Sequence, residues 1–266
     1  MSNPSMIGWD HPDTARYYEA FDRRHGRYRR ANRILAAHAA LAPGLRVLDV
    51  AAGAGGTARS ALKRLGPGGN VVCFEPAAAM RALGEKSLPN PRVSWREDWP
   101  VEPDAFDRIL CGAAIWQLRP LEETFRRCFA LLRPGGGLVF DLPSLYLGEP
   151  DEPGGGRDPY LIELSASLAA GRTNAAESCT PLPGAAAIEG LLATAGFRAE
   201  RWGFILPFRQ RAYRDWLKIP PTTDGILAGL DARERAQAID GAFRRVDPDA
   251  WRQERWTGWT AWKATS

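Results

Sequence analysis

Residues 47–58 read Val-Leu-Asp-Val-Ala-Ala-Gly-Ala-Gly-Gly-Thr-Ala, and this stretch decides how the rest of the chain is interpreted. A short apolar run that contains a carboxylate is followed by small residues and then by residues that form helices well. This order predicts a buried strand, a tight turn and a helix, in which the backbone of the turn can approach a nucleotide closely.

Two cofactor-binding families share this pattern. Asp49-x-Ala51-x-Gly53-x-Gly55 resembles the D/E-x-G-x-G-x-G signature of class I S-adenosylmethionine (SAM) dependent methyltransferases. Gly53, Gly55 and Ala58 also satisfy G-x-G-x-x-G/A, the fingerprint of NAD(P)-dependent Rossmann oxidoreductases. The stretch alone does not separate the two families, so the remaining sequence must do so.

The composition is that of an ordinary globular protein. Of 266 residues, 45% are hydrophobic and 25% are charged, and the formal net charge is +4. Basic and acidic residues are interspersed, which is typical of a solvated surface, so we expect no nucleic-acid partner. One local basic cluster lies on a predicted N-terminal helix and consists of Arg23, Arg24, Arg27, Arg29 and Arg30. We favour a solvated surface for this cluster over the alternative that it binds a polyanion.

The cysteines and the apolar segments place the chain in a reducing, aqueous compartment. Its four cysteines, Cys73, Cys111, Cys128 and Cys179, include no C-x-x-C pair, so we expect buried small hydrophobes and neither a disulfide framework nor a metal site. We see no secretory signal and no run of about 18 apolar residues. We therefore expect a soluble, cytoplasmic protein that makes no membrane contact.

Short apolar runs alternate with helical patterns through the first half of the chain, which predicts a parallel sheet covered on both faces. Residues 12–41 are predicted to form two helices that break near Gly26, with Asp13 and Thr14 as caps for the first. Further helices are expected at about 55–65, 77–86 and 121–132. The predicted strands are Val47–Ala51, Asn70–Glu75, Arg92–Trp95, Phe106–Cys111 and Gly137–Asp141.

After Asp141 the alternation is interrupted by two insertions, at about 142–183 and 207–250. The first is rich in Pro and Gly around one short helix near 160–170, and the second contains a helix at 231–245. A helix at 184–195, a strand over Phe197–Leu206 and a closing strand over Glu254–Lys263 complete the pattern. In the closing strand, Trp256 and Trp262 share one face and Trp259 the other; we favour core over interface for these tryptophans and Trp251.

Three further segments resemble the class I methyltransferases. Residues 106–117, Phe-Asp-Arg-Ile-Leu-Cys-Gly-Ala-Ala-Ile-Trp-Gln, are similar to the family's fourth strand and the turn after it. Residues 131–140, Leu-Leu-Arg-Pro-Gly-Gly-Gly-Leu-Val-Phe, match the L-x-P-G-G-x-L segment before the fifth strand, and Ala-Gly-Phe at 195–197 resembles the start of the sixth. This order favours the methyltransferase over the oxidoreductase.

The resemblance implies a fold and a division of the chain. The fold is a doubly wound, mostly parallel seven-stranded α/β sheet of the Rossmann-like methyltransferase type, with an N-terminal helical lid and two insertions. Residues 1–43 are expected to form the lid, and residues 44–266 the SAM-binding domain.

The resemblance also implies a cofactor, SAM, and the residues that hold it. Glu75, about twenty residues after the glycines, is expected to bind the ribose hydroxyls. Ala51 replaces the family's first glycine, which is tolerable if the turn keeps a negative φ there. The expected cofactor-binding residues are Asp49, Ala51, Gly53, Gly55, Glu75, Asp98, Trp99, Cys111 and Tyr18.

Absent motifs narrow the substrate. The chain lacks the D/N-P-P-Y/F of nucleic-acid amino-methyltransferases, the Pro-Cys of cytosine methyltransferases and the Asp-Asn pair of magnesium-dependent catechol enzymes. Long insertions are usually functional lids, and their aromatic content suits a small apolar or aromatic molecule. Trp116, Gln117 and Tyr146 are candidates for its pocket, and His11, His25 and Gln117 are candidates for a catalytic role.

The residues leave several points open. The acceptor could be an O, N or C atom, and the oligomeric state is undecided. Besides the oxidoreductase, two alternatives remain, because one fold hosts several functions. One is a SAM-fold protein with different chemistry, and the other is a non-catalytic interaction module.

Overall fold

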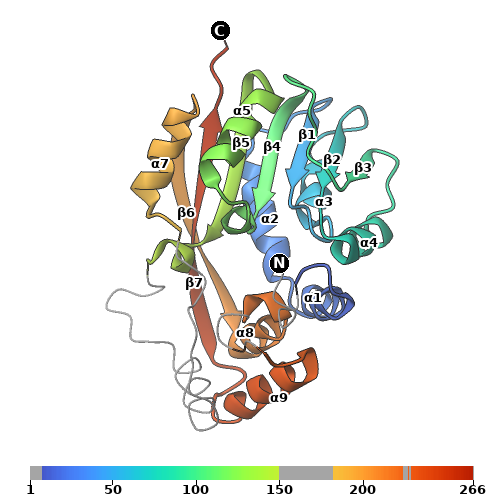
Figure 1. Ribbon diagram of the computed structural model, residues 1–266, viewed down its shortest axis with the longest axis vertical. Coiled ribbons are helices and arrows are strands. Elements are labelled where there is room, and N and C mark those ends of the chain that lie inside the picture. Colours follow the sequence, from blue (N-terminus) through green and yellow to red (C-terminus); the bar gives the residue numbers. More distant parts are fainter. Residues whose placement is uncertain (1–7, 150–181, 224–226, 228, 266) are drawn as a thin grey trace.

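The computed structural model describes residues 8–149, 182–223, 227 and 229–265, which form an α/β fold around one sheet (Figure 1). The strands are β1 (Arg46–Val50), β2 (Asn70–Phe74), β3 (Val93–Arg96), β4 (Phe106–Gly112), β5 (Leu132–Pro143), β6 (Arg198–Arg209) and β7 (Trp251–Trp262). The helices are α1 (Pro12–His25), α2 (Arg27–His38), α3 (Gly56–Leu62), α4 (Ala78–Ser87), α5 (Leu121–Leu131), α7 (Ala185–Thr194), α8 (Gln210–Leu217) and α9 (Ala232–Phe243).

The strand order is β3-β2-β1-β4-β5-β7-β6, which confirms the expected seven-stranded, mostly parallel sheet. Strands β1 to β5 pair in parallel, whereas β7 runs antiparallel to both of its neighbours, β5 and β6. The chain winds outward in opposite directions from β1 and β4. In open α/β sheets the crevice at such a reversal, beyond the carboxyl ends of the strands, is where ligands bind.

Successive side chains of the central strands point to opposite faces of the sheet and pack into two separate apolar layers. Leu138 and Phe140 of β5 belong to the layer under α5 and α7, where Phe140 stacks on Phe125 at 5.6 Å between ring centroids. Val139 points to the opposite layer, with Leu110 of β4 and with Leu35 of α2. Because both faces are covered, the strands are continuously apolar in sequence, as predicted for a parallel sheet.

The two predicted N-terminal helices are present, and Gly26, at φ 60°, separates them. The predicted caps of the first helix were wrong. The Nδ1 atom of His11 accepts a hydrogen bond from the backbone N–H of Asp13 at 3.2 Å, which makes His11 the N-cap. Thr14 lies one turn further in, where its hydroxyl donates to the carbonyl of Gly8 at 2.8 Å.

Strand β7 and the elements before it build the end of the sheet away from β3. Trp256 and Trp259 are fully buried on opposite faces, in line with the core interpretation, whereas Trp251 is 61% exposed. The second predicted insertion contains α8 and α9, which pack beside α1 below the carboxyl ends of the parallel strands (Figure 1). The helix predicted near 160–170 lies outside the described residues.

Two features that the composition raised, the cysteines and the apolar content of the helices, can be followed in the described part of the chain. Cys73, Cys111 and Cys128 are buried free thiols, while Cys179 lies outside the described residues. None of the described helices combines the length and the apolar content that a bilayer crossing requires.

Glycine 258 on β7 gives a stability test of this packing. A Cβ atom there would lie 2.4 Å from the ring of Trp202, which stacks on His38 at 3.9 Å. We expect Gly258→Ala to lower the free energy of unfolding by about 1–3 kcal/mol, because overpacking displaces the indole. Gly241→Ala on exposed α9 meets nothing within 4 Å and should raise stability by about 0.5–1 kcal/mol. Urea unfolding measures both, and an unchanged Gly258→Ala would contradict this packing.

Candidate functional site

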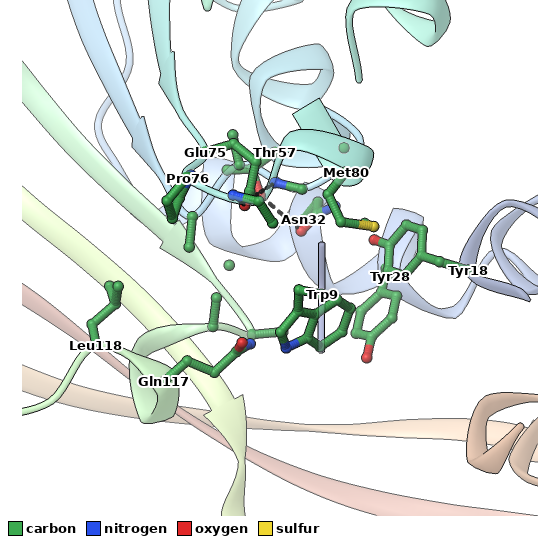
Figure 2. Close-up of a pocket in the computed structure, with 18 residues that line it drawn as sticks. Trp9, Tyr18, Tyr28, Asn32, Thr57, Glu75, Pro76, Met80, Gln117 and Leu118 are labelled. Carbon is green, nitrogen blue, oxygen red and sulfur yellow. Dashed lines mark hydrogen bonds between the residues drawn. The ribbon is translucent and has the colours of Figure 1, made fainter. Parts of the chain in front are cut away.

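A cavity of about 220 Å³ opens at the carboxyl ends of β1 and β4, where the winding of the sheet reverses. Its walls come from the loops after β1, β2 and β4, from α1 and α2, and from Trp9 ahead of α1. Figure 2 shows Glu75 and Met80 on one side, Gln117 and Leu118 on the other, and the rings of Tyr18 and Tyr28 at one end.

The turn after β1 has the left-handed backbone that its glycines predict. Gly53 and Gly55 have φ values of 53° and 78°. A Cβ atom on Gly53 would contact only the Met80 side chain, at 3.7 Å, so this backbone is open to the cavity. Gly55 plays a different part, because a Cβ atom there would lie 3.3 Å from the ring of Trp95. Gly55 is therefore a packing residue, and it does not line the cavity.

The turn does not meet the condition under which alanine would be tolerated without strain at residue 51, a negative φ. The φ of Ala51 is 53°, in the left-handed region, and the residue lines the cavity. A left-handed residue with a side chain costs roughly 1–2 kcal/mol relative to the right-handed form. The turn therefore keeps the conformation of a glycine at this position although the residue is alanine.

Glu75, directly after β2, ties the turn to the neighbouring strand. Its Oε2 accepts the N–H of Gly53 at 2.7 Å, and its Oε1 accepts the N–H of Ala77 at 2.9 Å. Burial raises the pKa of the carboxyl, and the two backbone N–H groups oppose that rise. A carboxylate oxygen has two lone pairs, so each oxygen can accept a further hydrogen bond from a hydroxyl in the cavity.

Helices α2 and α3 meet at the end of β4 through a polar contact that the sequence did not reveal. The hydroxyl of Thr57 donates to Oδ1 of Asn32 at 3.1 Å, and both side chains line the cavity. A Cβ atom on Gly112 would lie 2.6 Å from the Thr57 hydroxyl and 2.8 Å from Asn32 Oδ1. Gly112 therefore leaves the room that α2 and α3 occupy at the strand end.

Asp49, the carboxylate of the opening motif, lies beside the cavity but does not line it. Its Oδ2 accepts the N–H of Ala58 at 2.8 Å, which fixes the first turn of α3 to β1. Its Oδ1 is buried and has no hydrogen-bond partner among the described residues. Burial raises the pKa of Asp49 to about 8. Asp49 therefore ties β1 to α3, and its contact with a cofactor stays a prediction.

Aromatic residues of the N-terminal segment form one wall. The rings of Tyr18 and Tyr28 stack at 5.9 Å between centroids, and Trp9 meets Tyr18 edge-on at 6.4 Å. Trp216 of α8 donates its Nε1–H to the Tyr28 hydroxyl at 2.8 Å, which connects this wall to α8. Burial raises the pKa of both tyrosines, so their hydroxyls are neutral. Only Tyr18 of these three residues was predicted.

Several predicted site residues lie away from this cavity. Trp116 and Tyr146 stack on each other at 4.8 Å and pack against the core layer under α5. Trp99 packs against the same layer, and Cys111 is buried within it. Asp98 is exposed. None of these five lines the cavity, so their assignment to cofactor or substrate stays a prediction.

The two histidines considered for catalysis have other partners. His11 caps α1. Nε2 of His25 lies 2.8 Å from Oδ2 of Asp215 on α8. Neither lines the cavity, whereas Gln117, the third candidate, does. Among the described lining residues, the titratable side chains are Glu75, Tyr18 and Tyr28.

Asp141 is a second buried carboxyl beside the cavity, at the end of β5. It is fully buried, and its Oδ1 accepts the N–H of Ala113 at 3.0 Å, which holds that cavity-lining residue at φ 57°. Its Oδ2 has no partner among the described residues, and burial raises its pKa to about 8. Sequence patterns gave no reason to single out this residue.

The sheet order, the glycine turn after β1 and the carboxylate of Glu75 after β2 are those of a Rossmann-like domain, in which a nucleoside cofactor binds at this edge of the sheet. Residues 23–201 match the family described as "Methyltransferase domain". The match covers more than half of the chain, so the protein belongs to this family. Its strand order and its glycine motif are those of the class I SAM-dependent methyltransferases.

One curated relative is the ubiquinone/menaquinone biosynthesis C-methyltransferase UbiE of Bordetella parapertussis (strain 12822 / ATCC BAA-587 / NCTC 13253). It is 30% identical over 107 residues, which are 38% of this chain and 42% of the relative. The match therefore spans less than half of the length of that protein.

Two solved structures share the fold. Phosphoethanolamine N-methyltransferase 2 of Haemonchus contortus, in complex with phosphomonomethylethanolamine and S-adenosylhomocysteine, has a TM-score of 0.60 at 18% identity. That match covers 98% of this chain and 61% of the other. The [4+2]-cyclase SpnF has a TM-score of 0.57 at 16% identity, covering 90% of this chain and 82% of the other.

The residues present fit SAM. Glu75 would offer carboxylate lone pairs to the ribose hydroxyls, Gly53 leaves the turn open to the cavity, and Tyr18 contributes an aromatic face to the wall. An aromatic face attracts a cation such as a sulfonium. The cavity therefore matches both the polar and the cationic part of the cofactor.

Replacing the Glu75 carboxylate should weaken SAM binding. Glu75→Gln puts an amide nitrogen, a donor, against one of the two backbone N–H groups. We expect a loss of affinity of about tenfold to a hundredfold, since a mismatched buried hydrogen bond costs roughly 1–3 kcal/mol. Isothermal titration calorimetry with SAM measures it, and Glu97→Gln at an exposed position is the control. Unchanged affinity in Glu75→Gln would contradict this role.

Asp141 should make stability depend on pH. Its folded pKa of about 8 lies above the ordinary aspartate pKa of 3.8, so the folded state binds one more proton than the unfolded state between these two pH values. The stabilising contribution is complete below about pH 4 and is lost as pH rises to about 8, by up to about 1.4 kcal/mol per unit. The free energy of unfolding of Asp141→Asn, measured with urea, should therefore fall less steeply with rising pH across this window. Exposed Asp98→Asn should follow the parent protein, and an identical slope for Asp141→Asn would disprove the assignment.

Proposed function

We propose that this protein transfers a methyl group from SAM to an O, N or C atom of a small apolar or aromatic molecule. The observation that carries the proposal is the hydrogen bond between Glu75 and the Gly53 N–H, opposite a wall of three aromatic rings. One side of the cavity suits a nucleoside, and the other suits an apolar ligand.

SAM, when bound, supplies a methyl group on a positively charged sulfur, which reacts with a nucleophile in line. The chain's own residues hold and orient the reactants. Glu75 accepts the ribose hydroxyls, and the open backbone at Gly53 permits close approach. Ala113 and Gln117, just after β4, lie on the side where we place the acceptor. Backbone at the carboxyl end of a central strand is well suited to this, because the sheet fixes it rigidly.

Positioning and exclusion of water account for the chain's contribution to the rate. No histidine is among the described lining residues, and Glu75 already accepts two backbone hydrogen bonds. Alignment of two bound reactants can lower a barrier by about 7–11 kcal/mol without a protein base. Trp9, Tyr18 and Tyr28 would close the cavity against water.

The N-terminal segment and the insertions are the parts that would choose the substrate. We propose residues 1–43 as the lid, because Trp9, Tyr18, Tyr28 and Asn32 all reach the cavity from it. The Tyr28–Trp216 hydrogen bond connects this lid to α8 of the second insertion. An acceptor seated between them would meet mainly apolar surface.

A second candidate is SAM binding with other chemistry. Its specific support is the likeness to SpnF, a protein of this fold that is named as a cyclase. The cofactor contacts of Glu75 and Gly53 would be the same in both cases, so only the reaction distinguishes them.

Binding and turnover test the proposal together. We expect SAM to bind in a titration and NADH not to, and we expect S-adenosylhomocysteine to form when small aromatic acceptors are added. Gly53→Arg should abolish SAM binding by filling the open side of the turn. Gly190→Arg, at an exposed site on α7 where a Cβ atom meets nothing within 4 Å, is the matched control. NADH binding without SAM binding would refute the proposal, and SAM binding with no methylated product would favour the second candidate.

A further inference from the structure

A second cavity of about 150 Å³ lies on the other side of the first turn of α2. Tyr28 lines the SAM cavity, whereas its neighbour Arg27 lines this one. The walls are the end of α1, the start of α2, the end of β6, the start of α8 and Trp251. Five arginines line it: Arg24, Arg27, Arg30, Arg209 and Arg211.

Carboxylates neutralise three of these arginines. Nη1 of Arg24 lies 2.8 Å from Oδ2 of Asp215, which also contacts His25, another lining residue. Arg27 forms a buried two-point pair with Glu254. Arg211 pairs with Asp249 at the surface. His25 and Arg24 share Asp215 with Arg214 and Lys218. The single negative charge of Asp215 therefore does not offset the remaining positive charge of the cavity.

The other two arginines have no carboxylate partner in the described part of the chain. Nη1 of Arg30 donates to the carbonyl of Pro207 at 2.9 Å. Nη1 of Arg209 donates to the carbonyl of Asp249 at 2.5 Å, and its guanidinium lies 3.7 Å from the centroid of the Trp251 ring. A carbonyl satisfies one donor but cancels no charge. The cavity therefore has an excess of positive charge.

A buried donor adds to this imbalance. Nη1 of Arg27 is buried and has no hydrogen-bond partner among the described residues, although the rest of its guanidinium is paired with Glu254. An unpaired donor of a buried charged group is costly, and like charges converging on one cavity repel each other. An anion in the cavity would relieve the repulsion between these charges.

We propose that this cavity binds the phosphate group of a small soluble molecule, at a site distinct from the SAM cavity. Arg30 and Arg209 present planar guanidinium groups from two different elements, α2 and β6, and such groups match the oxygens of a phosphate in two-point contacts. The two uncompensated positive charges correspond to a phosphate dianion better than to a carboxylate. The ring of Trp251 provides an apolar side for the rest of the ligand.

The position of the site connects it to the lid. Gly26 joins α1, which carries Tyr18 to the SAM cavity, to α2, which carries Arg27 and Arg30 to the basic cavity. A Cβ atom on Gly26 would lie 2.6 Å from the Arg29 guanidinium, and its φ is 60°. An anion held by Arg30 and Arg209 would therefore bridge α2 and β6 close to the junction of the two N-terminal helices.

Thermal unfolding in the presence of inorganic phosphate tests the proposal, because a ligand that binds only the folded state raises the midpoint. Ionic strength is held constant with sodium chloride, since screening alone changes surface electrostatics. We expect a saturable rise with phosphate and little with acetate. In the double variant Arg30→Gln/Arg209→Gln, the phosphate concentration for half of the maximal rise should increase at least tenfold. Arg126→Gln on α5, an arginine paired with Glu122, should behave as the parent does.

Three outcomes would overturn the site: no saturable rise in the parent, an equal response to acetate, or equal weakening in Arg126→Gln and the double variant. SAM titration of the double variant shows whether it has folded, because neither arginine touches the first cavity. Vesicles containing phosphatidic acid distinguish a lipid headgroup from a soluble ligand. Binding to these vesicles that depends on Arg30 and Arg209, without any response to free phosphate, would also refute the proposal.

Discussion

The hydrogen bond from the Gly53 N–H to the Glu75 carboxylate is the contact on which the site depends. It joins the turn after β1 to the end of β2, two segments whose strands already pair in parallel. The turn must keep its left-handed backbone for the Gly53 N–H to point at Glu75, and Ala51 adopts that backbone despite its side chain. One carboxylate thus fixes the loop, and its remaining lone pairs give the cavity its polar side.

Most of the fold could be predicted, because the strands that form its centre are short apolar runs separated by helical patterns. The predicted range 106–111 and the observed β4 differ by a single residue. β5 was predicted too short, since Arg133 and Pro134, just after its first residue, are exposed and carry no strand pattern. Helix caps were harder to predict from the sequence. Histidine is a rare N-cap, and nothing in the sequence favoured His11 over Asp13.

Residues of the cavity that lie in a local motif could be predicted from the sequence. Residues that reach the cavity only through tertiary contacts could not. Gly53 and Glu75 lie in motifs with fixed spacing. Asn32 and Tyr28 reach the cavity from α2 only because that helix packs over the end of β4, a geometry that no local pattern records. For Trp116 the local position pointed elsewhere. It follows β4, which suggested a pocket residue, but its ring packs against the core layer under α5.

The place of β7 has a consequence for how the chain assembles during synthesis. The strand enters the sheet between β5 and β6, although both precede it in sequence. Until residue 262 has left the ribosome, β5 and β6 each present an unpaired edge, and β5 carries the apolar segment Leu138–Phe140. Exposed apolar edges invite pairing with other chains. Pairing of β7 is therefore the step that covers the apolar edge of β5, and a nascent chain stalled before Trp251 would be a natural client for chaperones.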